Sequence, residues 1–373
     1  MANLLLTGLY GKNYLENLRQ MQGISLQLHI TAKCDQRCKH CYMYNSELYE
    51  PQINNPLSKE QMFLLLDEYY GLMNQYGCKG TVAITGGDPI LSPYFWDLLE
   101  YIKLKYAHSG HVIIMGNSYH ITRPVAERMK MLGIYSYQIS IDGMQEKHDY
   151  IRKDGSFKDA FRALKILYET GIKTVVGFTV SKENVNELLP LYRYIKSLDY
   201  IDSFGFNRLI PTGNGKNMAD QVFTADEYRK LLFDIYKQEV FEQTKFVIYP
   251  KEKMWKPLLW ELGLTDPIDL NKEKYAIAGC GAGVDTISVL ADGTVMPCRH
   301  MDITIGKYPD KSLKEIYREN TICRDIRAYE KYDNCSKCEL SMICRGCLAM
   351  RYAMCGSIYT KEPYCWKEGY SIE

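Results

Sequence analysis

The stretch Thr31-Ala-Lys-Cys-Asp-Gln-Arg-Cys-Lys-His-Cys-Tyr42 places Cys34, Cys38 and Cys41 on one short loop with the spacing C-x3-C-x2-C. It directly follows an apolar run, residues 24–30, which is typical of a buried strand. Three thiolates can hold three corners of an iron–sulfur cube and leave the fourth iron open, whereas four cysteines close a metal site completely. The loop therefore predicts an open iron–sulfur centre, with a structural zinc knuckle as the alternative.

The composition restricts the class of protein. With 373 residues, the chain is long enough for one large α/β domain and a smaller one. A net charge of +1 creates no field that favours nucleic acid or an anionic membrane. We find no signal peptide and no apolar run of membrane-spanning length, so we expect a cytoplasmic protein without a membrane partner. Thirteen cysteines in a reducing compartment then favour metal ligation over disulfides.

Alternating β-branched and helical segments predict βα units around a parallel sheet. The strand candidates are residues 24–31, 80–85, 112–116, 136–141, 174–180 and 203–209. The helix candidates between them are residues 59–75, 94–105, 124–132, 157–170 and 185–197. Six strands and five helices are too few for a closed eight-fold barrel, so we predict an α/β fold with an open, partial (β/α)6 TIM barrel.

The chain divides into four predicted parts. Residues 1–23 are an N-terminal extension, and residues 24–210 form the partial barrel. Residues 211–279 are a linker and helical bridge, with a helix predicted over 226–241. Residues 280–373 form a cysteine-rich tail with a predicted hairpin, whose strands 286–290 and 294–296 flank a turn at Ala291-Asp-Gly293.

Residues after the first four strands resemble motifs of the radical S-adenosylmethionine (radical SAM) superfamily. That family's loop is C-x3-C-x-aromatic-C, and His40 fills the aromatic position. Thr85-Gly-Gly-Asp-Pro89 is similar to its G-G-E-P loop, with Asp88 in place of glutamate. Gly116-Asn117-Ser118 stands where relatives often have T-N-G, and Ser140-Ile-Asp-Gly143 is similar to S-x-D-G. His148 and Arg152 match H-x3-R.

The resemblance implies a [4Fe-4S] cluster on Cys34, Cys38 and Cys41. It implies that the backbone of the glycine loop receives the amino group of SAM, and that Arg152 binds its carboxylate through a two-pronged donor geometry. The SAM-binding residues implied in this way are His40, Gly86, Gly87, Asp88, Asn117, Ser140, Asp142 and Arg152.

The tail resembles the SPASM domain, an extension that holds auxiliary iron–sulfur clusters in radical SAM maturases. All but one of its cysteine spacings match; the last pair is C-x2-C, one residue short. The resemblance implies one auxiliary [4Fe-4S] cluster on Cys335, Cys338, Cys344 and Cys365. It implies a second on Cys280, Cys298 and Cys347, with Cys323, Cys355 or an open iron at the fourth position. A pair of zinc sites is the alternative, because C-x2-C spacing also suits zinc.

If the resemblance holds, reductive cleavage of SAM gives a 5′-deoxyadenosyl radical that removes hydrogen from a substrate. A SPASM tail implies a peptide substrate, and electron-accepting auxiliary clusters favour an oxidation. We therefore predict a maturase of ribosomally synthesised peptides (RiPPs) that forms a thioether or another side-chain crosslink. Flavodoxin or ferredoxin is the expected electron donor.

Four other functions compete with this prediction. Sulfatase maturases carry an aspartate, the proposed proton acceptor, after the hairpin cysteine, where this chain has Arg299, which cannot act as a base. A peptide epimerase needs a hydrogen donor such as a cysteine, for which Cys323 or Cys355 could be proposed. A small-molecule dehydrogenase would cleave SAM in response to a metabolite. A non-catalytic metal-binding protein should have lost the cysteine triad or the glycine loop, and both are present.

Overall fold

One mixed sheet forms the centre of the computed structural model, which describes residues 23–242, 247–249, 252–264 and 279–367. Its ten strands have the order β10-β9-β8-β1-β2-β3-β4-β5-β6-β7. The strands are β1 (Ser25–His29), β2 (Gly80–Thr85), β3 (Gly110–Met115), β4 (Ile134–Ser140), β5 (Lys173–Val180), β6 (Ser203–Arg208), β7 (Val247–Tyr249), β8 (Thr286–Val289), β9 (Thr294–Met296) and β10 (Gly306–Lys307). The strands from β8 to β7 run parallel, while β9 and β10 continue antiparallel, and the two ends do not pair.

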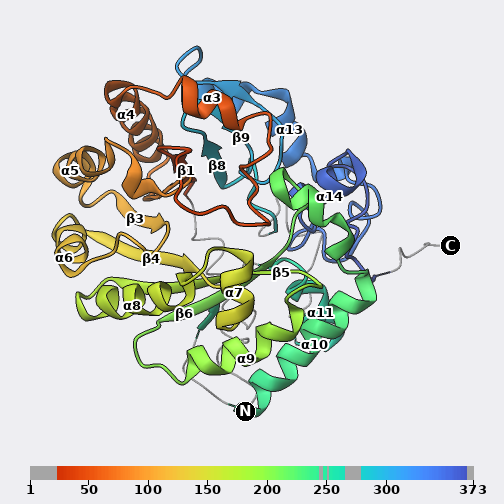
Figure 1. Cartoon of the computed structure of the whole chain (residues 1–373). Coiled ribbons are helices and arrows are strands. Elements are labelled where there is room, and N and C mark those ends of the chain that lie inside the picture. The colour runs from red at the N-terminus through yellow and green to blue at the C-terminus, as the bar shows by residue number, and fades with distance from the viewer. Residues whose placement is uncertain (1–22, 243–246, 250–251, 265–278, 368–373) are drawn as a thin grey trace.

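Most helices lie in an arc outside the strands, along the left and lower side of Figure 1. The C-terminal segment, coloured blue, lies at the upper right. The helices are α3 (Tyr49–Asn54), α4 (Lys59–Gln75), α5 (Phe95–Tyr106), α6 (Arg123–Met131), α7 (Gln145–Ile151), α8 (Ser156–Glu169), α9 (Val185–Lys196), α10 (Ala225–Glu242), α11 (Trp255–Glu261), α12 (Leu313–Glu319), α13 (Thr321–Arg327) and α14 (Leu348–Cys355). Three short 3-10 helices are η1 (Pro89–Leu91), η2 (Gly213–Gln221) and η3 (Tyr329–Lys331). Within the described ranges, no helix combines the length and hydrophobicity that a bilayer span requires.

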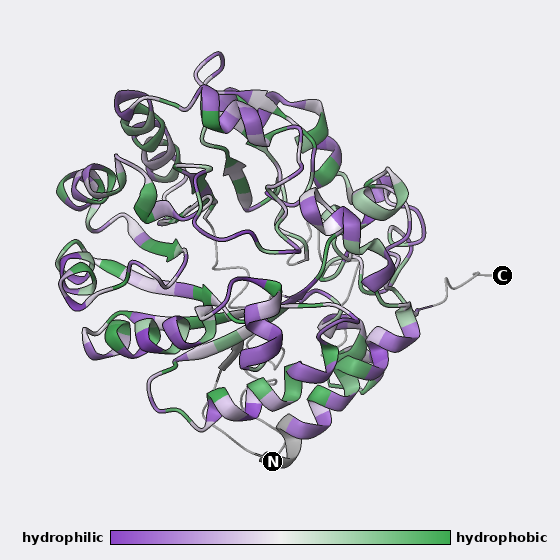
Figure 2. Ribbon diagram, in the orientation of Figure 1, coloured by the Kyte–Doolittle hydropathy of each residue, from purple (hydrophilic) through white to green (hydrophobic). Residues whose placement is uncertain are grey.

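The first βα unit shows why the sequence forms these layers. Leu26 and Leu28 alternate along β1 and are fully buried against the helices. Ser58 and Gln61 form a reciprocal capping box that starts α4, and Tyr69 on its buried face donates to the Ile24 carbonyl. Figure 2 shows hydrophobic residues along the strands and on the inner sides of the helices, with hydrophilic residues outside. Burial of this apolar face therefore fixes each helix on the sheet.

The predicted fold class is confirmed, and the sheet is longer than expected. All six predicted strands and five predicted helices are present, with ends that differ by one or two residues. The predicted hairpin forms β8 and β9, but β8 also pairs with β1, so it joins the parallel sheet. β7 adds a further strand beside β6. Residues 1–22 of the predicted N-terminal extension 1–23 and bridge residues 265–278 lie outside the described residues, and the four-part division stays a prediction.

Candidate active site

The three-cysteine loop leaves β1 at the carboxyl end of the strand and brings three free thiols together. Burial raises the pKa of Cys38 to about 12, and the negative charges of Cys41 and Cys34 raise it while Arg152 opposes this. The amide of Lys39 donates to the Ile151 carbonyl at 3.0 Å, which ties the loop to the end of α7. Neighbouring thiols without a disulfide suit a metal centre, whose binding would release their protons.

The glycine loop after β2 packs directly on the cysteine loop. The amide of Gly87 donates to the Thr31 carbonyl at 2.9 Å, and the amide of Asp88 donates to the Lys33 carbonyl at 2.8 Å. A Cβ added to Gly86 would lie 2.1 Å from the Thr31 carbonyl oxygen, and one added to Gly87 would lie 2.1 Å from that of Lys33. Only glycine permits this approach, and Gly86 also has a positive φ of 131°.

Three polar atoms near the glycine loop are buried without a hydrogen-bond partner: Asp35 Oδ2, Asp88 Oδ2 and His120 Nε2. Their ligand atoms lie within 4.8 Å of one another. Burial raises the pKa of Asp88 to about 6, although the Asn117 amide donates to its Oδ1 at 3.2 Å. Asn117 Nδ2 bridges Asp35 Oδ1 at 2.7 Å and Cys34 Sγ at 3.3 Å. His120 Nε2 lies 3.6 Å from Asp35 Oδ2, so the free oxygen of Asp88 beside this loop is the one that fits an ammonium group such as that of SAM.

Asp142 is the buried centre of a second network. Its Oδ2 accepts from Arg152 Nε at 2.5 Å and lies 3.4 Å from His40 Nε2. Its Oδ1 accepts from the Thr179 amide at 2.8 Å, and its own amide donates to His148 Nδ1 at 3.1 Å. Burial alone would raise the pKa of Asp142, but Arg152, His40 and the Thr179 amide bring it below the ordinary value. Asp142 is therefore a carboxylate that holds Arg152 in place.

Ser140 ends β4, where Gly177 of β5 is its register partner. A Cβ added to Gly177 would lie 3.7 Å from Ser140 Oγ, so the glycine leaves room beside the hydroxyl. The structure thus brings the predicted cysteine, glycine-loop, Asn117, Asp142 and Arg152 positions into contact and places Ser140 on a neighbouring strand end. The roles assigned to these residues stay predictions.

A cluster in the barrel interior was not predicted from the sequence. His29, the last residue of β1, is fully buried, and its ring lies 6.1 Å from that of Tyr42. The ring of His300 lies 4.5 Å from Tyr42 on the other side, and Arg299 Nε lies 3.3 Å from His300 Nε2. Burial, assisted by Arg299, lowers the pKa of His29 to about 3. A polar residue inside an apolar strand is the only sequence signal of this cluster.

Seven of the cysteines in the tail form two groups. Burial raises the pKa of Cys347, and the nearby charges of Cys280 and Cys298 raise it further, which places these three thiols together. Cys335, Cys338, Cys344 and Cys365 line a separate cavity of about 30 Å³. Arg351 is fully buried beside this second group and donates from Nη2 to Cys335 Sγ at 2.9 Å. This division agrees with the predicted ligand sets, which stay predictions.

The two cysteines predicted as candidates for the fourth position of the first group differ in burial, and the choice between them and an open iron stays a prediction. Cys323 is buried in the main hydrophobic core on α13, whereas Cys355 is exposed at the end of α14. Cys280 belongs to a second, smaller hydrophobic cluster, and Cys298, Cys335 and Cys347 pack against it.

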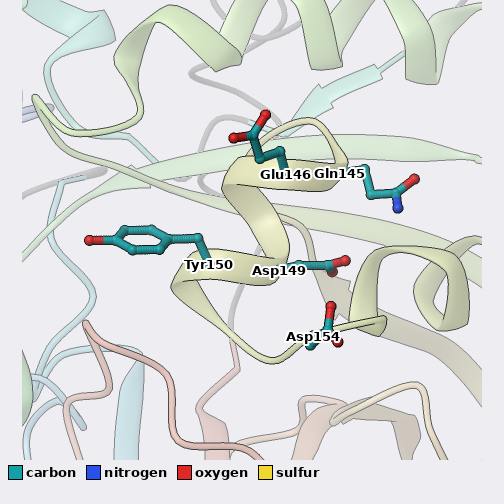
Figure 3. A pocket seen from close by; sticks show the side chains of 5 residues that line it. All are labelled: Gln145, Glu146, Asp149, Tyr150 and Asp154. Atoms are coloured by element: carbon teal, nitrogen blue, oxygen red, sulfur yellow. The ribbon is translucent and has the colours of Figure 1, made fainter.

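A surface pocket of about 490 Å³ lies elsewhere, on α7 (Figure 3). Gln145, Glu146, Asp149, Tyr150 and Asp154 line it. Asp149 accepts from the amides of Gly155 and Phe157 at the start of α8, and Lys39 Nζ lies 2.9 Å from the centroid of the Tyr150 ring. These contacts give Asp149 and Tyr150 structural roles, so the cysteine loop remains the candidate active site.

Comparison with known proteins agrees with this geometry. The sequence profile of the radical SAM superfamily matches residues 28–195, and that of SPASM, an iron–sulfur cluster-binding domain, matches residues 280–339. The fold and the three-cysteine loop define a radical SAM enzyme that uses SAM and an iron–sulfur cluster. Within that superfamily, the chain belongs to the subgroup with a SPASM domain.

Relatives with different activities cover most of the chain. The AdoMet-dependent heme synthase of Oleidesulfovibrio alaskensis is 27% identical over 90% of this chain and 85% of its own length. The mycofactocin maturase MftC of Mycolicibacterium smegmatis is 24% identical over 92% of this chain and 82% of its own. The subtilosin biosynthesis protein AlbA of Bacillus subtilis is 25% identical over 85% of this chain and 65% of its own.

Solved structures share the fold. The structure of anSMEcpe with bound AdoMet has a TM-score of 0.69 at 19% identity and covers 91% of this chain and 93% of its own. Streptococcus suis SuiB bound to S-adenosylmethionine has a TM-score of 0.70 at 16% identity and covers 96% of this chain and 81% of its own. At these identities the likeness extends to the fold alone.

Proposed function

We propose that this enzyme oxidises a ribosomally synthesised peptide and forms a thioether or another side-chain crosslink. The observation that supports an oxidation is the presence of two further cysteine groups beyond the three-cysteine loop. A crosslink removes two hydrogens from the peptide: one leaves as an atom, and the other leaves as a proton and an electron. Auxiliary clusters in the tail suit the acceptance of that electron.

The first loop fits a SAM-binding cluster in its donor chemistry. Cys34, Cys38 and Cys41 would hold three irons, and the cluster would supply the electron that cleaves SAM to methionine and a 5′-deoxyadenosyl radical. The unpartnered oxygen of Asp88 would accept a hydrogen bond from the amino group of SAM beside the backbone of Gly86 and Gly87. Other SAM contacts are proposed for His40, Asn117, Ser140 and Arg152.

Arg152 and Asp142 would position SAM through charge. Asp142 Oδ2 engages Arg152 Nε, and Arg152 Nη1 also lies 3.6 Å from Cys38 Sγ. The guanidinium would thereby offset the negative charge of the thiolates and face the SAM carboxylate. Burial lowers the pKa of His40 to about 4, so its neutral ring can pack against SAM without an added charge.

Two auxiliary [4Fe-4S] clusters are proposed for the tail. Cys335, Cys338, Cys344 and Cys365 supply four thiolates to one, and Cys280, Cys298 and Cys347 supply three to the other. Arg351 supports the first of these sites, because a buried cation stabilises an anionic thiolate cluster.

The relatives favour a second candidate substrate, a tetrapyrrole. The AdoMet-dependent heme synthases of O. alaskensis and Nitratidesulfovibrio vulgaris each align with 90% of this chain, at 27% and 26% identity. The sulfatase branch is less well supported, since Arg299 occupies the position after Cys298 and cannot accept a proton.

Co-expression with each short open reading frame beside the gene tests the proposal. A peptide that loses the mass of two hydrogens only with active enzyme would support crosslinking, whereas unchanged mass with an inverted residue would identify an epimerase. In parallel, the reconstituted enzyme is incubated with Fe-coproporphyrin III and SAM. Consumption of the porphyrin with no modified peptide would overturn the peptide proposal in favour of the second candidate.

A further inference from the structure

We propose that Arg299, together with His29 and His300, forms a receptor for a carboxylate group of the substrate. This inference deepens the proposed function and rests on it, because it names the charge that the substrate carries into the barrel.

The side chain of Arg299 reaches from the tail hairpin to the strand ends of the barrel. Its Nη1 lies 3.3 Å from Met115 Sδ at the end of β3, and its Cζ lies 5.8 Å from the Tyr42 ring centroid. Since Tyr42 directly follows Cys41, the guanidinium lies beside the candidate SAM cluster. Arg299 therefore spans the space between the first cysteine loop and Cys298.

Arg299 has no carboxylate partner among the described residues, in contrast to the buried Arg208 and Arg152. Arg208 contacts Glu252 at 3.1 Å and Glu362 at 3.0 Å, and Arg152 contacts Asp142. Arg299 instead meets a thioether sulfur and an imidazole nitrogen, which are weaker partners for a guanidinium. The planar fork of a guanidinium matches a carboxylate, so this cation has the capacity to take one from a ligand.

His29 supplies the independent evidence that a ligand binds here. The residue is fully buried, yet neither ring nitrogen has a hydrogen-bond partner. An unsatisfied imidazole in the interior is costly unless a bound group or water completes it. The ring of Tyr42 lies next to those of His29 and His300 and 5.8 Å from Arg299 Cζ, so Tyr42 joins the three residues in one cluster. The cluster thus offers one cation and neutral N–H donors to a single anionic group.

A carboxylate in this position has two possible sources: an acidic residue or C-terminus of a peptide, or a propionate of a porphyrin. In a sulfatase maturase the residue after this cysteine is acidic, whereas here it is the cation Arg299. A positive side chain at this position favours a negatively charged substrate.

Paired probes that differ only in charge test the receptor. Coproporphyrin III is compared with its tetramethyl ester by fluorescence quenching, and a blocked peptide with one central glutamate is compared with its glutamine form by calorimetry. We expect at least one acid to bind the reconstituted enzyme about 10- to 100-fold more tightly than its neutral partner.

Arg299→Gln should abolish that preference for the acid, and Arg299→Lys should retain only part of it. Iron content verifies that the variants fold, and exposed Arg318→Gln is the matched control, which should keep the preference.

The outcomes separate the two proposals. If no acid binds more tightly than its neutral partner, or if Arg299→Gln keeps the preference, the receptor is wrong. A peptide crosslinked by an enzyme without acid preference would leave the proposed function standing and remove the receptor. If the enzyme prefers coproporphyrin III to its ester, loses that preference in Arg299→Gln and modifies no peptide, the carboxylate receptor is supported and the peptide substrate is contradicted.

Discussion

Arg152 and Asp142 form a buried ion pair that joins two loops of the candidate active site. Arg152 Nε lies 2.5 Å from Asp142 Oδ2, and Nη1 of the same guanidinium lies 3.6 Å from Cys38 Sγ. The side chain of Asp142 has no exposed surface, and that of Arg152 is 11% exposed. The loop after β4 and the cysteine loop therefore depend on one another electrostatically.

Asp142→Asn should destabilise the protein and abolish SAM cleavage. The substitution leaves the Arg152 charge buried without a partner, which costs about 3–5 kcal/mol in comparable sites. Anaerobic urea unfolding measures the stability, and 5′-deoxyadenosine formation measures the cleavage. Glu169→Gln breaks the exposed Arg123–Glu169 pair and should cost at most about 1 kcal/mol. Equal effects of the two substitutions would show that the Asp142 pair has no special role.

Gly87→Ala should prevent SAM binding. Its Cβ would lie 2.1 Å from the Lys33 carbonyl oxygen, so the glycine loop must move away from the cysteine loop. Equilibrium dialysis with labelled SAM measures the loss, expected to be at least about 10-fold. Gly71→Ala on α4 is the matched control, since its Cβ meets no atom within 4 Å and alanine stabilises helices by up to about 1 kcal/mol. Unchanged SAM affinity in Gly87→Ala would remove the loop from the binding site.

The sequence was sufficient to predict the βα units and the residues at the strand ends. Periodicity, the capping residue Ser58 and the turn at Gly293 are local signals, and each gave the correct element. The pairing of β8 with β1 could not be predicted, because it joins segments about 260 residues apart and depends on register. The electrostatic interaction between His29 and Arg299 was missed for the same reason, since the two residues are about 270 positions apart in the sequence.

Substitution of Cys34, Cys38 and Cys41 together by alanine should abolish 5′-deoxyadenosine formation and lower the iron content by about four atoms per chain. The tail cysteines lie in separate groups, so their iron should persist. Iron analysis and the rate of SAM cleavage provide the measurements. Zinc in place of iron in the triple variant would contradict the auxiliary-cluster assignment, and surviving cleavage would contradict the active-site assignment.

Arg351→Met should weaken the auxiliary site formed around Cys335. Arg351 donates to Cys335 Sγ at 2.9 Å and to the Arg345 carbonyl at 2.7 Å, so its loss removes a buried cation from the thiolates. We expect a loss of about four iron atoms per chain while SAM cleavage without substrate continues. Arg351→Lys keeps the charge and should retain more iron, which separates an electrostatic effect from a failure to fold. Full iron content in Arg351→Met would refute this role.

Stability should fall between pH 6.5 and about pH 4 because neutral histidines are buried. Burial lowers the pKa of His148 and His40 to about 4 in the folded state. The unfolded chain therefore binds these protons first as the pH falls, and each histidine costs up to about 1.4 kcal/mol per pH unit. His148→Gln should reduce the slope by about that amount, measured by urea unfolding at pH 5–7. The exposed control His108→Gln should keep the wild-type slope, and an unchanged slope in His148→Gln would contradict the expectation.

The pairing of β8 with β1 also constrains how the protein is made. The cysteine loop follows β1, which has β2 on one side, whereas its other neighbour, β8, lies about 260 residues further along the chain. During synthesis this strand has one edge uncovered until residues 286–289 emerge from the ribosome. The cysteine loop therefore acquires its complete support only after residues 286–289 have been synthesised, and we expect the first cluster to be held stably only after that point.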